Sequence, residues 1–258
     1  MGRGSRNSIL PIAANHRPRG APSHTLARVP YQKTIVCLAN SRKWQGRCIA
    51  GLEWTGTATG AWIRPVGAGE KGVINGERFC RNANGRDPQL LDLLTISFAA
   101  PQAHDFQVEN HLVASQQSWT FSGSAKWQDL LPAVEPVKGQ LWANVGHSRN
   151  GQNDMIPEEV APGLKSSLKL VQPEELTIKV TMEGRAGAEK RKLRGEFSLY
   201  GYWYTFSVTD SQMEQELRTC TPGTEKVLKN PLLCLSLSEV LPDVHACYKL
   251  IAGVIPTE

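Results

Sequence analysis

The loop after the first apolar segment gathers cations around an aromatic ring. Residues 41–47 place Arg42, Lys43 and Arg47 around Trp44, and Arg64 lies in a later strand-like segment. Guanidinium groups fork onto phosphate or carboxylate oxygens, and an aromatic face can stack on a nucleobase. The set therefore predicts a nucleic-acid-binding site. The alternative is a solvated hairpin tip on which Trp44 folds back as a lid.

A second pair of aromatic residues belongs to a predicted hairpin. Residues 193–199 and 202–208 alternate apolar and polar side chains around a turn at residues 200–201, so one side of the hairpin faces a core. Tyr200 and Trp203 point away from that side. They form either a contact buried between two domains, which the pattern slightly favours, or a stacking platform for bases. The basic run at 190–194 either steers phosphate towards them or is a solvated strand end.

One polar cluster could support acid–base chemistry. His104 or His111 could serve as a base, with Asp105 or Glu109 orienting the imidazole. No nucleophile elbow, metalloprotease motif, phosphate-binding loop or paired-carboxylate motif accompanies them. We therefore predict a structural hydrogen-bonding role for the cluster, no catalytic residues and no cofactor.

The positive charge of the chain is unevenly distributed. The net charge is +5, but residues 1–33 hold six basic and no acidic residues, which leaves 23 basic against 24 acidic residues in 34–258. Residues 1–31 are predicted to be a disordered basic leader that binds phosphate at most non-specifically. Residues 34–86 carry eight basic and three acidic residues, a modest footprint for an anionic partner.

The cysteine pattern argues against a metal site. None of the six cysteines forms a CxxC pair or has a histidine at ligand spacing. Four of them lie in apolar strand-like segments and are expected to be reduced and buried: Cys37, Cys48, Cys234 and Cys247. With no export signal and no apolar run long enough to span a bilayer, we expect a cytoplasmic protein without membrane association.

Strand-like segments dominate the rest of the chain. Short runs of β-forming residues separated by turns occur at 34–39, 48–52, 61–66, 90–98, 168–171, 176–182, 232–237 and 247–255. Residues 127–131 are typical of a short helix. The pattern predicts an all-β protein built from barrels or sandwiches. The Pro/Asn/Gly-rich region 143–165 is the best boundary between two halves, although a single large sandwich is an alternative.

Several segments resemble a known family. In order along the chain they are ANSRK (39–43), GRCIAG (46–51), WIRPV (62–66), DPQLLD (87–92), HDFQVENHL (104–112), YTFSVTD (204–210), SLSE (236–239) and CYKLIA (247–252). Together they are similar to the bacterial dual OB-containing domain, from about residue 33 to 256. The resemblance implies two consecutive OB-type β-barrels with a few short helices, at 32–145 and 165–258, joined by a connecting segment at 146–164. It transfers no catalytic residues.

Binding is the leading functional hypothesis. We expect a non-catalytic module that binds single-stranded DNA or RNA through its barrels, with a protein partner in a nucleic-acid-processing system as a further possibility. The alternatives are an enzyme acting on a nucleotide or phosphoester, and a protein-interaction scaffold, because a fold does not by itself imply a function. The near-neutral charge of residues 34–258 is the main argument against nucleic acid.

Overall fold

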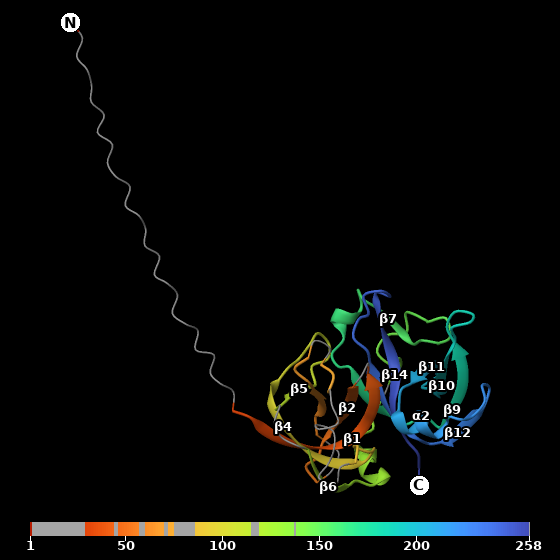
Figure 1. Ribbon diagram of the computed structural model, residues 1–258, viewed down its shortest axis with the longest axis horizontal. Coiled ribbons are helices and arrows are strands. Elements are labelled where there is room, and N and C mark those ends of the chain that lie inside the picture. Colours follow the sequence, from red (N-terminus) through yellow and green to blue (C-terminus); the bar gives the residue numbers. More distant parts are fainter. Residues whose placement is uncertain are drawn as a thin grey trace.

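A computed structural model gives the fold of this chain (Figure 1). It describes residues 1, 29–43, 46–56, 60–69, 72–74, 86–114, 119–136 and 138–257, except for the side chains of residues 42 and 43. The predicted leader at 1–31 therefore falls almost wholly outside the described residues. Within them the chain is mostly β-strand, as predicted, and its helices are short. None of the described helices is long and apolar enough to cross a membrane.

The first half of the chain forms a closed barrel. Its strands are β1 (Tyr31–Lys43), β2 (Gly46–Glu53), β3 (Trp62–Val66), β4 (Asp92–Pro101), β5 (Asn110–Val113) and β6 (Thr120–Ser124). Pairing runs β1-β2-β3-β5-β4, and β4 pairs back onto β1, while β6 pairs with the amino-terminal part of β4. β3 and β5 are parallel and the other pairs antiparallel. This is the five-stranded Greek-key barrel of the OB fold.

The length of β1 allows the barrel to close. The amino-terminal part of this strand, from Tyr31 to Val36, pairs with β4, and the part from Ile35 to Lys43 pairs with β2. A register shift between Cys37 and Ala39 marks an irregularity of the bulge type, which bends a strand. One strand can therefore contribute to both sides of the barrel. Apolar side chains that alternate along the strands fill its interior, among them Ile35, Ile49, Ile63, Ile96 and Phe98.

The second half repeats this order of pairing with a divided first strand. Its strands are β7 (Met155–Pro157), β8 (Leu168–Val171), β9 (Glu175–Glu183), β10 (Lys190–Leu199), β11 (Tyr202–Val208), β12 (Glu225–Lys229), β13 (Leu232–Leu237) and β14 (Ala246–Ile255). β8 pairs with β13 and β9 with β10, whereas β11 and β14 are parallel. β8 and β9 thus share the role of β1. Pro173, which cannot donate a backbone hydrogen bond, lies where they separate.

The predicted hairpin is confirmed as β10 and β11. Leu199 faces Tyr202 in the register, and the two residues between them, Tyr200 and Gly201, have φ values of 51° and 82°. Two consecutive positive φ angles characterise the type I′ turn, whose twist suits a two-residue hairpin. Phe197, Tyr204 and Phe206 pack on one another inside the second barrel, with ring centroids 5.3–5.4 Å apart. The alternation along the sequence therefore identified the core side correctly.

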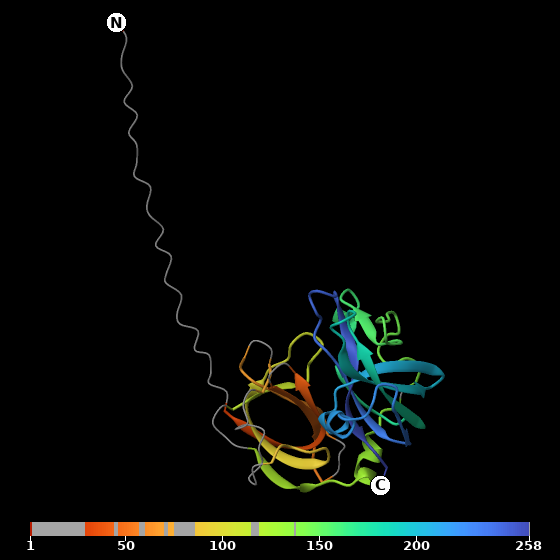
Figure 2. The same cartoon turned by 45° about the vertical axis from the view of Figure 1, so that its right-hand side comes forward.

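The two barrels lie side by side (Figure 2). They share a cluster of buried apolar side chains. Leu38 and Ala50, on the outer face of β1 and β2, belong to the same buried cluster as Leu168 and Ala252 of the second barrel. Backbones meet directly at this seam, because a Cβ added at Gly253 would lie 1.9 Å from the carbonyl oxygen of Leu38. Only glycine allows so close an approach. β1 therefore has both of its faces buried, one inside its own barrel and one against β14.

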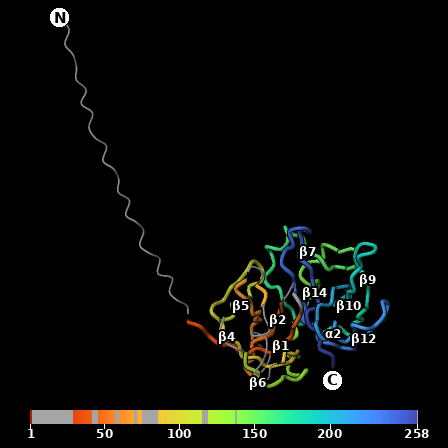
Figure 3. Tube along the Cα trace, viewed as in Figure 1, coloured from red at the N-terminus to blue at the C-terminus, as the bar shows by residue number. Residues whose placement is uncertain are grey.

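Three short helices complete the described part of the fold, and the chain trace in Figure 3 labels one of them, α2. They are the 3-10 helices η1 (Trp127–Ala133) and η2 (Ala161–Gly163) and the α-helix α2 (Ser211–Glu216). The predicted helix at 127–131 thus exists as a 3-10 turn. Asp210 caps α2, since its carboxylate accepts from the backbone N–H groups of Gln212 and Met213, and it also accepts from Val254 N at 2.8 Å. This carboxylate fixes α2 to β14.

Candidate functional site

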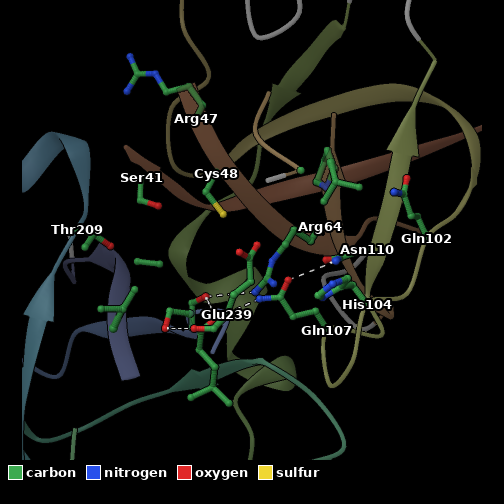
Figure 4. Close-up of a pocket in the computed structure, with 18 of the residues that line it drawn as sticks. Ser41, Arg47, Cys48, Arg64, Gln102, His104, Gln107, Asn110, Thr209 and Glu239 are labelled. Carbon is green, nitrogen blue, oxygen red and sulfur yellow. Dashed lines mark hydrogen bonds between the residues drawn. The ribbon is translucent and has the colours of Figure 1, made fainter. Parts of the chain in front are cut away.

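A pocket of about 220 Å³ lies at the seam between the barrels, on the outer face of β2 and β3 (Figure 4). Side chains alternate along β3, so Ile63 enters the barrel core while Arg64 points outward. The loop between β4 and β5 forms a second wall, with Gln102, His104 and Gln107. The second barrel supplies the opposite wall, from the end of β13 and from β14. The pocket thus needs elements of both barrels.

Arg64 lies at the centre of this pocket and is only 4% exposed. Its Nη2 is 3.4 Å from Oε1 of Glu109 and donates to the hydroxyl of Ser236 at 3.2 Å. The Ser167 hydroxyl donates to the same Glu109 oxygen. Serines of the second barrel therefore hold both members of a buried ion pair of the first, which offsets part of the cost of desolvating two charges.

The polar groups of the pocket are incompletely satisfied. Asn110 donates from Nδ2 to Oε1 of Gln107 at 3.3 Å, and Gln107 donates to the Leu237 carbonyl at 3.4 Å. Nε of Arg64, Oε2 of Glu109 and Oδ1 of Asn110 are buried without a hydrogen-bond partner. An unpaired buried donor or acceptor costs about 1–3 kcal/mol. Of these residues, Arg64 and Asn110 line the pocket, so its wall contains one unpaired donor and one unpaired acceptor.

The rim of the pocket carries the groups in contact with water. Arg47 stands at one end with its guanidinium directed away from Arg64, and it pairs with Asp87. His104 is exposed at the other side and lies 3.4 Å from the carboxylate of Asp105. Ser41 and Thr209 line the pocket with hydroxyl groups. Both arginines already face a carboxylate, so the pocket is polar rather than strongly cationic.

The family model of the dual OB-containing domain matches residues 33–254. The chain belongs to the dual OB-containing domain family. No curated protein matches it, and neither does any solved structure. The expected membership is confirmed, and the two pairing patterns above show how one dual OB-containing domain builds its barrels.

Only part of the predicted binding set comes together in this dual OB-containing domain. Arg47 and Arg64 both line the pocket. Arg42 and Lys43 lie at the end of β1, opposite Arg47 and Gly46, with backbones that the structure describes and side chains that it does not. Trp44 lies outside the described residues. Their part in binding stays a prediction.

The aromatic pair of the second barrel lies elsewhere. Tyr200 is 59% and Trp203 62% exposed, on the hairpin of β10 and β11, and neither lines the pocket. Burial of Trp203 between the domains, which the alternation slightly favoured, is therefore wrong. Alternation places a side chain on the outer face of a sheet but does not tell which outer face a second barrel covers. A stacking role for these rings remains a prediction.

The histidines predicted to hydrogen-bond lie in different elements, His104 in the loop between β4 and β5 and His111 in β5 itself. His111 shares a hydrogen bond with the Tyr31 hydroxyl and packs against Phe98. Burial, followed by the charge of Lys33, lowers its pKa. Its neighbour Asn110 faces the pocket instead, on the side of His104. Within the described residues, no three His, Cys, Asp or Glu side chains lie close enough to hold a metal ion.

The burial of the cysteines and the polar lining of the pocket differ in part from expectation. Cys37, Cys234 and Cys247 are buried as expected, but Cys48 is only half-buried, because it belongs to the outer face of β2 where the pocket opens. Sequence reasoning also missed polar residues that face the pocket: Gln107, Asn110, Thr209 and Ser236. No local signal separates these side chains from ordinary loop and strand-end residues.

Proposed function

We propose that this protein is a non-catalytic module that binds single-stranded nucleic acid, with one nucleotide held in the pocket between the barrels. The position of the pocket carries the proposal. OB barrels bind oligonucleotides on the face of their second and third strands and on the loops that join strands 1–2 and 4–5. The pocket lies on that face, and Gln102, His104 and Gln107 come from the loop that joins β4 and β5.

The chemistry of the pocket supports a nucleobase as the group inside. A base edge carries both donors and acceptors, and the pocket is lined by Arg64 and Asn110, whose Nε and Oδ1 have no hydrogen-bond partner. A volume of about 220 Å³ is below the roughly 300–1,000 Å³ typical of drug-sized ligands. The second barrel covers the remainder of the β2–β3 face. A nucleic-acid strand is therefore proposed to insert one nucleotide into the pocket, with its flanking nucleotides along the seam.

The phosphates would be held at the rim. Arg64 is buried in its pair with Glu109, whereas Arg47 is partly exposed in its pair with Asp87, so attraction for phosphate must come from Arg47 and from the predicted contributions of Arg42 and Lys43. Trp44, between these cations, is proposed to stack on a neighbouring base, and Tyr200 and Trp203 are proposed as a separate stacking platform on the second barrel. The proposed phosphate contacts and the proposed stacking contacts predict different dependences of the binding affinity on salt concentration.

Fluorescence anisotropy with labelled oligothymidylate and oligouridylate of eight nucleotides tests the proposal. We expect micromolar or tighter binding at 50 mM salt. Arg47→Ala should lower the slope of log affinity against log salt by about 0.7, the value for one phosphate contact of a single strand. Asn110→Ala and Trp44→Ala should weaken binding at every salt concentration, the latter by about 1–3 kcal/mol.

Arg185→Ala is the matched control, because Arg185 is exposed in the turn between β9 and β10 and does not line this pocket. It should bind as the wild type does. Circular dichroism and thermal unfolding verify that each variant is folded. Absence of micromolar binding by the wild type at low salt, or wild-type affinity in both Arg47→Ala and Asn110→Ala, would refute the proposal.

A further inference from the structure

A second pocket, of about 280 Å³, lies on the second barrel between β10, the end of β11 and α2. Three cations line it, Arg191, Lys192 and Arg218, against the single carboxylate of Glu214. Leu193 and Val208, both buried, contribute its apolar floor. This second pocket therefore combines a shaped cavity with an excess of positive charge, which the pocket between the barrels lacks.

The cations of the second pocket contrast with those of the adjacent strands. Along β9 and β12 lysines face carboxylates, for example Lys179 and Glu225 at 2.7 Å. In the described part of the chain, no carboxylate lies within ion-pair distance of Lys192 or Arg218. Two positive charges on the walls of one cavity, neither of them paired with a described carboxylate, favour an anionic ligand.

The walls of the second pocket are held in place. Arg191 donates to the carbonyl of Leu217 at the end of α2, which fixes one cation against the helix. The start of α2 is fixed by Asp210, through the hydrogen bonds from Gln212, Met213 and Val254. A cavity with preordered walls loses little conformational entropy on binding.

The two pockets are neighbours across the seam. Thr209 lines both of them. Ser41, which lines the pocket between the barrels, forms a backbone bridge with Asp210, the next residue after Thr209. Thr209 is therefore the point at which the pocket between the barrels adjoins the pocket that Arg191, Lys192 and Arg218 line.

We propose that the second pocket holds a backbone phosphate of the same single strand whose neighbouring nucleotide occupies the pocket between the barrels. The inference rests on the proposed function and deepens it, since it assigns the ligand as an oligonucleotide of at least two nucleotides rather than a free nucleotide. Arginine and lysine are the side chains that neutralise strand phosphates. Thr209 is the residue that both sets of described lining residues share, so the strand is proposed to pass from one pocket to the other at this residue.

A pair of double variants tests this assignment by anisotropy on the same eight-nucleotide probes. Lys192→Ala/Arg218→Ala removes two cations of the second pocket. Lys190→Ala/Arg185→Ala removes the same charge from residues of the same barrel that do not line either pocket. The first should lower the salt slope by about 1.4, so its loss of affinity relative to the wild type should shrink about sevenfold between 50 mM and 200 mM salt. The second should leave the slope unchanged.

Competition with thymidine and uridine monophosphate provides the second arm. We expect each monophosphate to displace the probes far less effectively than the unlabelled oligonucleotide at equal nucleotide concentration. Equal competition by the monophosphates, or equal salt slopes for the two double variants, would overturn the assignment while leaving wild-type binding and the Arg47→Ala effect, and hence the proposed function, intact. If the wild type binds neither oligothymidylate nor oligouridylate, the proposed function fails and the assignment with it.

Discussion

Lys249 should make the stability of the protein depend on pH above neutrality. This lysine of β14 is fully buried, and its Nζ donates to the Ala143 carbonyl at 2.6 Å and to Oδ1 of Asn144 at 3.0 Å. It also lies 5.8 and 5.9 Å from the ring centroids of Tyr204 and Phe206. Loss of water lowers the pKa of Lys249 to about 7, although the negative charge of Asp154 opposes the shift.

The direction of the effect follows from proton counting. Between pH 7 and the unfolded value of 10.5, the unfolded chain holds a proton on Lys249 that the folded chain has released. Stability therefore rises with pH in this range, by up to about 1.4 kcal/mol for each pH unit. From pH 7 to pH 10 the increase is worth roughly 4 kcal/mol.

Urea unfolding of the wild type and of Lys249→Met at pH 7, 8.5 and 10 measures this contribution. Methionine retains an unbranched stem but cannot titrate, so the free energy of unfolding of the wild type relative to Lys249→Met should increase by roughly 4 kcal/mol over the range. Other titrating groups cancel in that difference. Lys190→Met, at an exposed position of β10, is the control and should show no such trend. A wild-type advantage that is the same at pH 7 and pH 10 would refute the reasoning.

The seam and the thiols yield two more predictions. Gly253→Ala should destabilise the protein by about 1–3 kcal/mol or more in thermal or urea unfolding, because its Cβ would meet the backbone of Leu38 at 1.9 Å; an unchanged midpoint would mean that the barrels do not approach so closely. Under native conditions a thiol reagent followed by mass spectrometry should modify Cys48 well before Cys37 and Cys234, since burial raises the pKa of both buried thiols and shields them; labelling at equal rates would contradict this order.

The local pattern of apolar and polar residues is sufficient to predict the strands and the hairpin from the sequence. Alternating side chains on both sides of Tyr200-Gly201 fix the register of β10 and β11, and this signal needs no knowledge of the rest of the chain. The run at 34–39 also reads correctly as a buried strand. The structure explains why this run is apolar throughout: Ile35 faces the interior of its own barrel, and Leu38 faces the second barrel. A strand buried on both faces loses the alternation that an exposed face would give.

The candidate site could not be assembled from the sequence. Arg64 meets Ser236 across 172 positions of the chain, and no local pattern reports such a contact. The resemblance predicted two barrels but not the faces on which they meet. Arg64 could therefore be predicted as a binding residue from the chemistry of its side chain. Its pairing with Glu109 and with the serines that hold the pair could not be predicted, because these contacts depend on how the barrels pack. For the same reason Trp203 was assigned correctly to an outer face and wrongly to a buried one.

The location of the pocket links binding to the packing of the barrels. Its walls come from β3 and the β4–β5 loop on one side and from β13, β14 and Thr209 on the other, so neither barrel alone contains the site. A ligand that requires both walls stabilises the packed arrangement by mass action, in proportion to the logarithm of its concentration over its dissociation constant. An oligonucleotide at 100 times its dissociation constant should therefore raise the free energy of unfolding by about 2.7 kcal/mol. Gly253→Ala, which alters the seam without touching a pocket side chain, should weaken binding as well as stability. If this variant binds the oligonucleotide as tightly as the wild type does, the site belongs to the first barrel alone.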